Sequence, residues 1–164
     1  ASQLLISGQE QYALLSEPSA TSVITRAASS GTSLHRNLDM NEEWVLASGG
    51  TSQSAIAGTI ALGGMTANDE VIAVFLEKYR EAVTWMMENP VEAGELGAEV
   101  LSEQGFTAEI LTGSLENITW RFVPASEGYQ DIEAFLLALM SVSVNYTGGR
   151  LPDKEFYYEK SPTG

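Results

Sequence analysis

One long amphipathic pattern constrains the fold of this chain more than any other feature. Between residues 68 and 88, apolar side chains recur at steps of three and four, which is the spacing of one face of an α-helix. They are Ile72, Phe75, Leu76, Tyr79, Val83 and Met86. Asp69 and Glu70 lie in the first turn, where the helix dipole favours negative charge. The pattern predicts a helix that ends near Asn89, because the residue before a proline avoids the helical region.

Residues that commonly begin and end helices mark further segments. Asn89 and Pro90 have the positions of an N-cap and a first helical residue, and Gly105 closes the helix that they begin. Asp39 and Glu42 have the spacing of a capping box. The other predicted helices cover residues 1–7, 19–30, 40–47, 107–111 and 126–143.

Short apolar runs between the helices predict β-strands. Residues 11–15 (QYALL) and 55–62 (AIAGTIAL) are apolar enough for buried strands, and 34–38 (LHRNL) is a third candidate. Apolar and polar side chains alternate over 118–122, which predicts a short extended segment. The first of these runs is followed by a polar turn and a helix, which is the local unit of an α/β fold. The expected fold class is therefore α/β, rich in helix with a few short strands.

Composition narrows the function classes. The chain has 164 residues, which is the length of one domain, and a net charge of −14. Nucleic acid and anionic membrane surfaces are not expected partners, because both need a basic surface. No apolar run approaches the ~18–20 residues of a membrane span. Thiol chemistry is excluded because there is no cysteine, and His35 is the only histidine available to a triad or a metal site. We therefore expect no catalytic residues, no metal and no cofactor.

A first candidate binding region follows the strand predicted at 11–15. Ser16, Glu17 and Ser19 lie where that strand would end and the next helix would begin. In open α/β sheets, ligands bind beyond the carboxyl ends of strands and near helix N-termini. The alternative is that Ser16 or Glu17 only caps the helix.

A second candidate region is the stretch that contains Asn117, Trp120 and Arg121. Here the indole ring could stack on a ligand and the guanidinium could pair with an anion. The alternative is that Trp120 is a core residue and Arg121 a surface charge. A third stretch, the glycine-containing polar residues 49–53, has no phosphate-binding motif and is interpreted as a plain loop.

Several short motifs, taken in order along the chain, resemble a known family. They are LLISG at 4–8, ALLSEP at 13–18, LHRNLD at 34–39, EEW at 42–44, FLEKYREA at 75–82, ENPVEA at 88–93, GGRLPD at 148–153 and FYY at 156–158. This ordered set resembles the later half of ABC-transporter solute-binding proteins, in particular the nitrate/sulfonate/taurine and thiamine-precursor group. The resemblance covers nearly the whole chain.

The resemblance implies a fold, a function and partners. Members of this family have two α/β lobes of the type II periplasmic-binding-protein kind, which close on a small polar solute and deliver it to a membrane permease. Residues 1–164 would form the C-terminal part, with the end of one lobe and the C-terminal helices of the other, and the N-terminal part would be absent. We expect a periplasmic or extracytoplasmic protein that performs no catalysis and binds solute weakly by itself. Glu17 in the cleft would disfavour anions unless Arg121 or an upstream cation neutralised it.

Two other function classes stay open. A stand-alone sensor or interaction domain that reuses this fold is the alternative, because a fold does not determine a function. An enzyme related to pyrimidine synthases, which share the fold, is third, and a chain with one histidine and no cysteine argues against it. An upstream secretory signal and first lobe would favour transport, whereas a membrane anchor joined to a kinase or cyclase would favour sensing.

Overall fold

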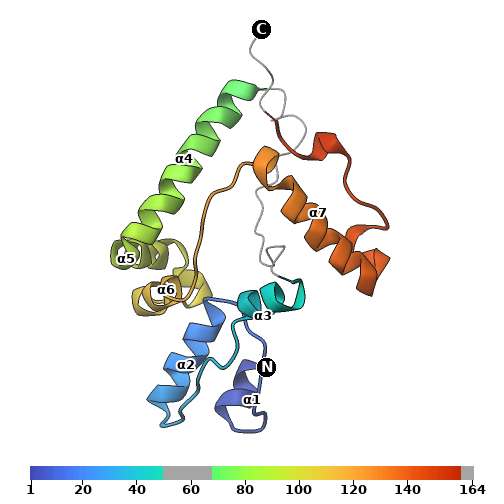
Figure 1. Ribbon diagram of the computed structural model, residues 1–164. Coiled ribbons are helices and arrows are strands. Elements are labelled where there is room, and N and C mark those ends of the chain that lie inside the picture. Colours follow the sequence, from blue (N-terminus) through green and yellow to red (C-terminus); the bar gives the residue numbers. More distant parts are fainter. Residues whose placement is uncertain (50–67, 160–164) are drawn as a thin grey trace. The chain divides into compact units, whose positions relative to one another are not determined.

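The structure, a computed structural model, describes residues 1–49 and 68–159, and its regular elements there are helices (Figure 1). The α-helices are α1 (Ser2–Ile6), α2 (Ser19–Ser29), α3 (Met40–Ala47), α4 (Asp69–Glu88), α5 (Pro90–Val100), α6 (Ala108–Leu115) and α7 (Ala125–Val142). Three short 3₁₀ helices are η1 (Ser102–Gln104), η2 (Val144–Thr147) and η3 (Lys154–Phe156). None of the helices in the described ranges is both long and apolar enough to cross a membrane.

The predicted α/β fold class is wrong, because no β-strand forms within residues 1–49 and 68–159. The runs 11–15 and 34–38 have no regular structure, and Tyr12 and Leu38 within them are 78% and 68% exposed. The predicted strand at 55–62 lies outside the described residues. A strand depends on a neighbouring strand for its backbone hydrogen bonds, and a short apolar run does not specify that partner. The described segments therefore stay unpaired although their composition suits a strand.

Most predicted helix boundaries lie close to the observed ones, because capping is a local interaction. Two predicted ends are wrong: α5 ends at Val100 rather than at Gly105, and α6 continues to Leu115 rather than ending at residue 111. The Asp39 side chain accepts a hydrogen bond from the backbone N–H two residues later (2.8 Å), and Thr107 accepts one from three residues later (3.3 Å). Asn89 behaves differently from the prediction: its side chain donates to the carbonyl oxygen of Trp85 (2.9 Å). Its side chain therefore closes α4 and makes no cap hydrogen bond to α5. Gly105, at φ 77°, ends η1 in the left-handed conformation that glycine adopts without strain.

The chain forms two compact units, and each collects segments that are distant in sequence. The first contains Ala1–Arg36 and Tyr79–Phe122, and the second contains Asn37–Lys78 and Val123–Gly164. Helix α4 therefore contributes its first half to the second unit and its second half to the first. The expected division into the end of one lobe and the helices of another stays a prediction.

In the first unit, α5 and α6 pack side by side and α2 lies against α6 (Figure 1). The two helices come close together at Gly94, where an added Cβ atom would overlap the side chain of Thr112. The Thr112 hydroxyl also donates to the carbonyl oxygen of Pro90 (3.3 Å). The buried apolar side chains of this unit are Leu5, Val23, Ala27, Ile110 and Leu111. This small core fixes α6, and the chain that leaves α6 runs past the second half of α4.

The second unit is held together by aromatic contacts on α7. Trp44 of α3 meets Phe135 of α7 edge-on, with 5.6 Å between ring centroids, and Tyr157 lies 6.1 Å from Tyr129 of α7. Tyr157 is 7% exposed, and its hydroxyl has no hydrogen-bond partner in the part of the chain that the structure describes. Burial raises the pKa of Tyr157 above its ordinary value, and the negative charge of Glu133 raises it further. These contacts hold the C-terminal segment against α7.

Candidate functional site

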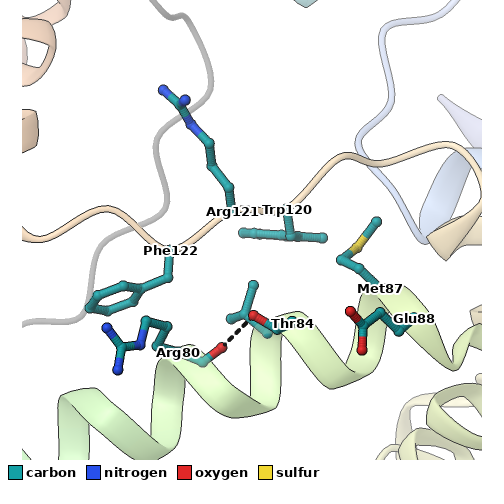
Figure 2. A pocket seen from close by; sticks show the side chains of 8 residues that line it. Arg80, Thr84, Met87, Glu88, Trp120, Arg121 and Phe122 are labelled. Atoms are coloured by element: carbon teal, nitrogen blue, oxygen red, sulfur yellow. Dashed lines mark hydrogen bonds between the residues drawn. The ribbon is translucent and has the colours of Figure 1, made fainter.

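A groove in the first unit is bounded by the second half of α4 and by the chain that follows α6 (Figure 2). Its volume is ≈ 390 Å³, within the roughly 300–1,000 Å³ that is usual for small-molecule pockets. The lining residues are Arg80, Val83, Thr84, Met87 and Glu88 of α4, together with Trp120, Arg121 and Phe122. This groove, called the α4 groove below, is the candidate site.

The segment opposite α4 presents alternate side chains to the groove. Trp120 and Phe122 point toward α4, whereas Arg121 extends away from it (Figure 2). This is the alternation that the sequence predicts for an extended segment over 118–122. Phe122 is held by an edge-to-face contact with Tyr79, with ring centroids 5.9 Å apart and planes at 76°. Trp120 is 38% exposed, so it is the aromatic ring that a ligand can reach.

Charged side chains lie at both ends of the α4 wall. Arg80 and Glu88 are eight residues apart, which is about 12 Å along a helix axis. Neither of them forms an ion pair with another residue of the described ranges. Thr84 lies between them, and its hydroxyl donates to the carbonyl oxygen of Arg80 (3.0 Å), as drawn in Figure 2. The groove thus offers a cation at one end, a carboxylate at the other, and apolar surface from Met87 and Trp120 between them.

Trp120 and Arg121 are the two predicted ligand residues that line the α4 groove. Arg121 contributes its stem, because its guanidinium points away from α4 (Figure 2). An anion inside the groove would therefore pair with Arg80. Asn117 is not a lining residue, and its side chain donates to the carbonyl oxygen of Gly113 (2.6 Å) at the end of α6.

Glu17 does not line the α4 groove; its carboxylate holds the start of α2. One carboxylate oxygen, Oε2, accepts hydrogen bonds from the backbone N–H (3.0 Å) and the hydroxyl (2.7 Å) of Thr21. The other, Oε1, accepts from Nη2 (2.6 Å) and Nε (3.2 Å) of Arg36, and the same Nη2 donates to Thr21 Oγ1 (2.6 Å). The Glu17 side chain is 12% exposed. This geometry fits the capping alternative, and it is Arg36 that neutralises the charge.

Ser16 and Ser19 lie beside Glu17 at the same helix end. Ser16 is exposed and its carbonyl oxygen accepts from the N–H of Ala20 (3.0 Å), while Ser19 is the first residue of α2 and is half-buried. Neither is a lining residue of the α4 groove. The six predicted residues therefore fall at the start of α2, at the end of α6 and in the α4 groove, and their binding of a solute stays a prediction.

The sequence reasoning missed the α4 side of the groove and the role of Arg36. Arg80, Thr84 and Glu88 recur every four residues, which places them on one face of the predicted helix. That signal could have identified the wall, but it does not identify the segment that faces it. Arg36 was assigned to a strand, and nothing local connects it to Glu17, 19 positions earlier.

The rest of the described chain offers weaker candidates. Residues 1–49 and 68–159 contain no group of three or more histidine or carboxylate side chains that could hold a metal ion. His35 is exposed, and its Nε2 lies 2.9 Å from the hydroxyl oxygen of Ser33. A shallow apolar depression on α3 is lined by Asn41, Glu42, Val45 and Leu46, and none of these described lining residues is aromatic. The polar loop predicted at 49–53 lies outside the described residues from position 50 onward.

Comparisons with protein-family models, with curated proteins and with solved structures found no match to this chain.

Proposed function

We propose that this chain acts in solute capture for a membrane importer, and that it contacts a small ring-bearing solute through the α4 groove. The observation that carries the proposal is the exposed indole of Trp120, which faces α4 across a groove of ≈ 390 Å³. The ordered motifs of the sequence support the transport role. That role implies a membrane permease as partner and a periplasmic or extracytoplasmic location. The proposal rests on the groove and on the ordered motifs, and the α/β fold that the resemblance implied is not part of it.

The groove favours a flat polar ring over a small inorganic anion. A ring can stack on Trp120 and place polar groups toward Arg80 at one end and Glu88 at the other. Nitrate has no apolar surface to bury there. The expectation that Glu17 disfavours anionic solutes loses its basis, because Arg36 already pairs with that carboxylate. An aminopyrimidine, with ring nitrogens as acceptors and an amine as donor, matches this arrangement best.

The proposed role is binding without chemistry. The hydroxyl of Thr84 is engaged with the helix backbone, so it is not activated by a neighbouring base. The described lining residues include no histidine that could serve as such a base.

Titration of the chain with solutes of different classes tests this function. We expect an aminopyrimidine to bind with a Kd of about 0.1 mM or weaker by isothermal titration calorimetry, which does not depend on a tryptophan signal, and nitrate and taurine to give no saturable heat. At ~100-fold its Kd, the bound solute should raise the free energy of unfolding by roughly 2.7 kcal/mol. Replacing Trp120 by leucine removes the stacking ring and should weaken binding about three- to tenfold, since aromatic pairs contribute ~0.5–1.5 kcal/mol beyond burial.

Trp85→Leu is the matched control. Trp85 also lies on α4 and is 41% exposed, but it does not line the groove. We expect the control variant to retain the wild-type affinity within about twofold. Saturation by no solute of the panel, or equal weakening by Trp85→Leu and Trp120→Leu, would overturn the assignment of the groove.

A further inference from the structure

Helix α5 has one packed face and one face open to solvent. Its packed face meets α6 at Gly94, which is buried. Its other side carries alternating apolar and acidic residues, all exposed, and is called the α5 outer face below. The residues of the α5 outer face are Val91, Glu92, Glu95, Leu96, Glu99 and Val100.

The acidic side chains form a stripe with apolar borders. At 100° per residue, Glu92, Glu95 and Glu99 fall in the centre of the outer face, Val91 falls on one border, and Leu96 and Val100 fall on the other. Leu96 is 54% exposed and Val100 is 77% exposed. Each apolar border would gain from burial against a partner, and the charged stripe between the borders would need opposite charge across the contact.

The charge of this stripe has no compensation nearby in the sequence. Residues 81–120 contain no lysine, arginine or histidine and eight glutamates, at positions 81, 88, 92, 95, 99, 103, 109 and 116. None of the three stripe glutamates pairs with a cation in the described part of the chain. Like charges three and four residues apart destabilise a helix, so Glu92, Glu95 and Glu99 oppose the stability of α5 as it stands. A cationic partner would turn this repulsion into attraction.

We propose that the α5 outer face docks a basic amphipathic helix of another protein. The partner would place lysine or arginine opposite the glutamate stripe and leucine-like side chains against Leu96 and Val100. A helix fits because the outer face is itself the convex side of a helix, and two helices pack at 8–10 Å with their side-chain ridges interleaved. A second copy of this chain does not fit, because a symmetric contact would oppose two identical acidic stripes. An anionic membrane or nucleic acid is repelled for the same reason.

Fluorescence anisotropy with a designed probe tests the proposal on the full chain. The probe is a labelled peptide of about 18 residues, built from leucine on one helical face and lysine on the other. We expect one peptide to bind per chain, and the binding to weaken at least about tenfold between ~20 mM and ~500 mM NaCl, since exposed charges are screened by salt. The triple change Glu92→Gln, Glu95→Gln and Glu99→Gln should weaken binding by about tenfold or more at low salt.

A second triple variant separates a specific surface from diffuse attraction. Glu10, Glu127 and Glu155 are exposed and lie outside α5, so changing them to glutamine removes the same charge from other places. This control should change peptide affinity less than about twofold, and Leu96→Ser should weaken it about threefold or more by removing an apolar border. Trp120→Leu should have no effect, because the α4 groove is a separate site. Equal weakening by the two triple variants, no effect of Leu96→Ser, or no binding of the peptide would each overturn the proposal.

Discussion

At the scale of single residues, Glu17 shows how one half-buried carboxylate can organise a helix start. Its four hydrogen bonds join Thr21 and Arg36, and the Glu17 side chain is only 12% exposed. Glu17→Gln should lower the free energy of unfolding by about 1–2 kcal/mol, because an amide N–H₂ would face donors and leave Arg36 without its charge partner. We expect the loss of free energy of unfolding to lie near the lower end of this range, because the Arg36 side chain is 39% exposed and solvent screens its charge. Urea unfolding followed by circular dichroism measures it.

The control at this scale is Glu10→Gln. Glu10 is exposed, and its side chain has no hydrogen-bond partner in the described residues, so its change should stay within about 0.5 kcal/mol of the wild type. Glu17→Gln should also leave the affinity of the α4 groove for an aminopyrimidine unchanged. Weaker solute binding by a fully folded Glu17→Gln protein would show that Glu17 contacts the ligand, as first predicted from the sequence.

At the scale of elements, helices could be predicted from the sequence and strands could not. The side chains of Asp39 and Thr107 accept hydrogen bonds from backbone N–H groups at most three residues away. The residue types that predict these helix starts are therefore the ones that form the capping hydrogen bonds. A strand needs a neighbouring strand for its backbone hydrogen bonds, and such a neighbour is not specified locally. Residues 11–15 pair with no other strand in the described chain. Asn89 is an intermediate case, because it lies between α4 and α5 and could cap either helix. Its side chain donates to the carbonyl oxygen of Trp85 in α4.

The close packing of α5 against α6 can be tested by replacing two glycines of α5 with alanine. An alanine Cβ at Gly94 would lie 2.9 Å from the backbone nitrogen of Thr112 and 3.0 Å from the carbonyl oxygen of Ala108, and backbone atoms cannot rotate away. Gly94→Ala should therefore destabilise the chain by about 1–3 kcal/mol despite the better helix propensity of alanine. At Gly97 the nearest atom is the flexible Cδ1 of Leu111 at 3.0 Å, so Gly97→Ala should be neutral or stabilising by up to ~1 kcal/mol. Thermal unfolding of the two variants compares them, and equal melting temperatures would contradict the close packing at Gly94.

At the scale of the whole molecule, the sequence could not show which distant segments meet. Trp120 was identified as a ligand candidate from its own stretch, but its position opposite Met87 depends on the packing of α6. The ion pair of Arg36 with Glu17 likewise depends on the packing of segments that are distant in the sequence. Of the predicted ligand residues, Trp120 and Arg121 line the α4 groove, and their binding of a solute stays a prediction. The α4 wall that completes the groove was not predicted. Long-range packing decided both outcomes.

Net charge is a property of the whole chain that can be read from the sequence, and it predicts how added salt changes the stability of the folded chain. The chain carries 22 acidic residues and 8 lysines and arginines, so its folded form concentrates like charges. Ion pairs such as that of Glu17 with Arg36, and the exposed one of Arg150 with Asp153, offset little of this. Raising NaCl from about 0.01 M to 0.15 M shortens the screening length from ~30 Å to ~8 Å and weakens the repulsion. The melting temperature should rise by about 2–4 °C, equivalent to ~1 kcal/mol for a chain of this size. A melting temperature that fell with added NaCl would mean that attractive pairs outweigh the repulsion, and that the acidic surface does not oppose folding.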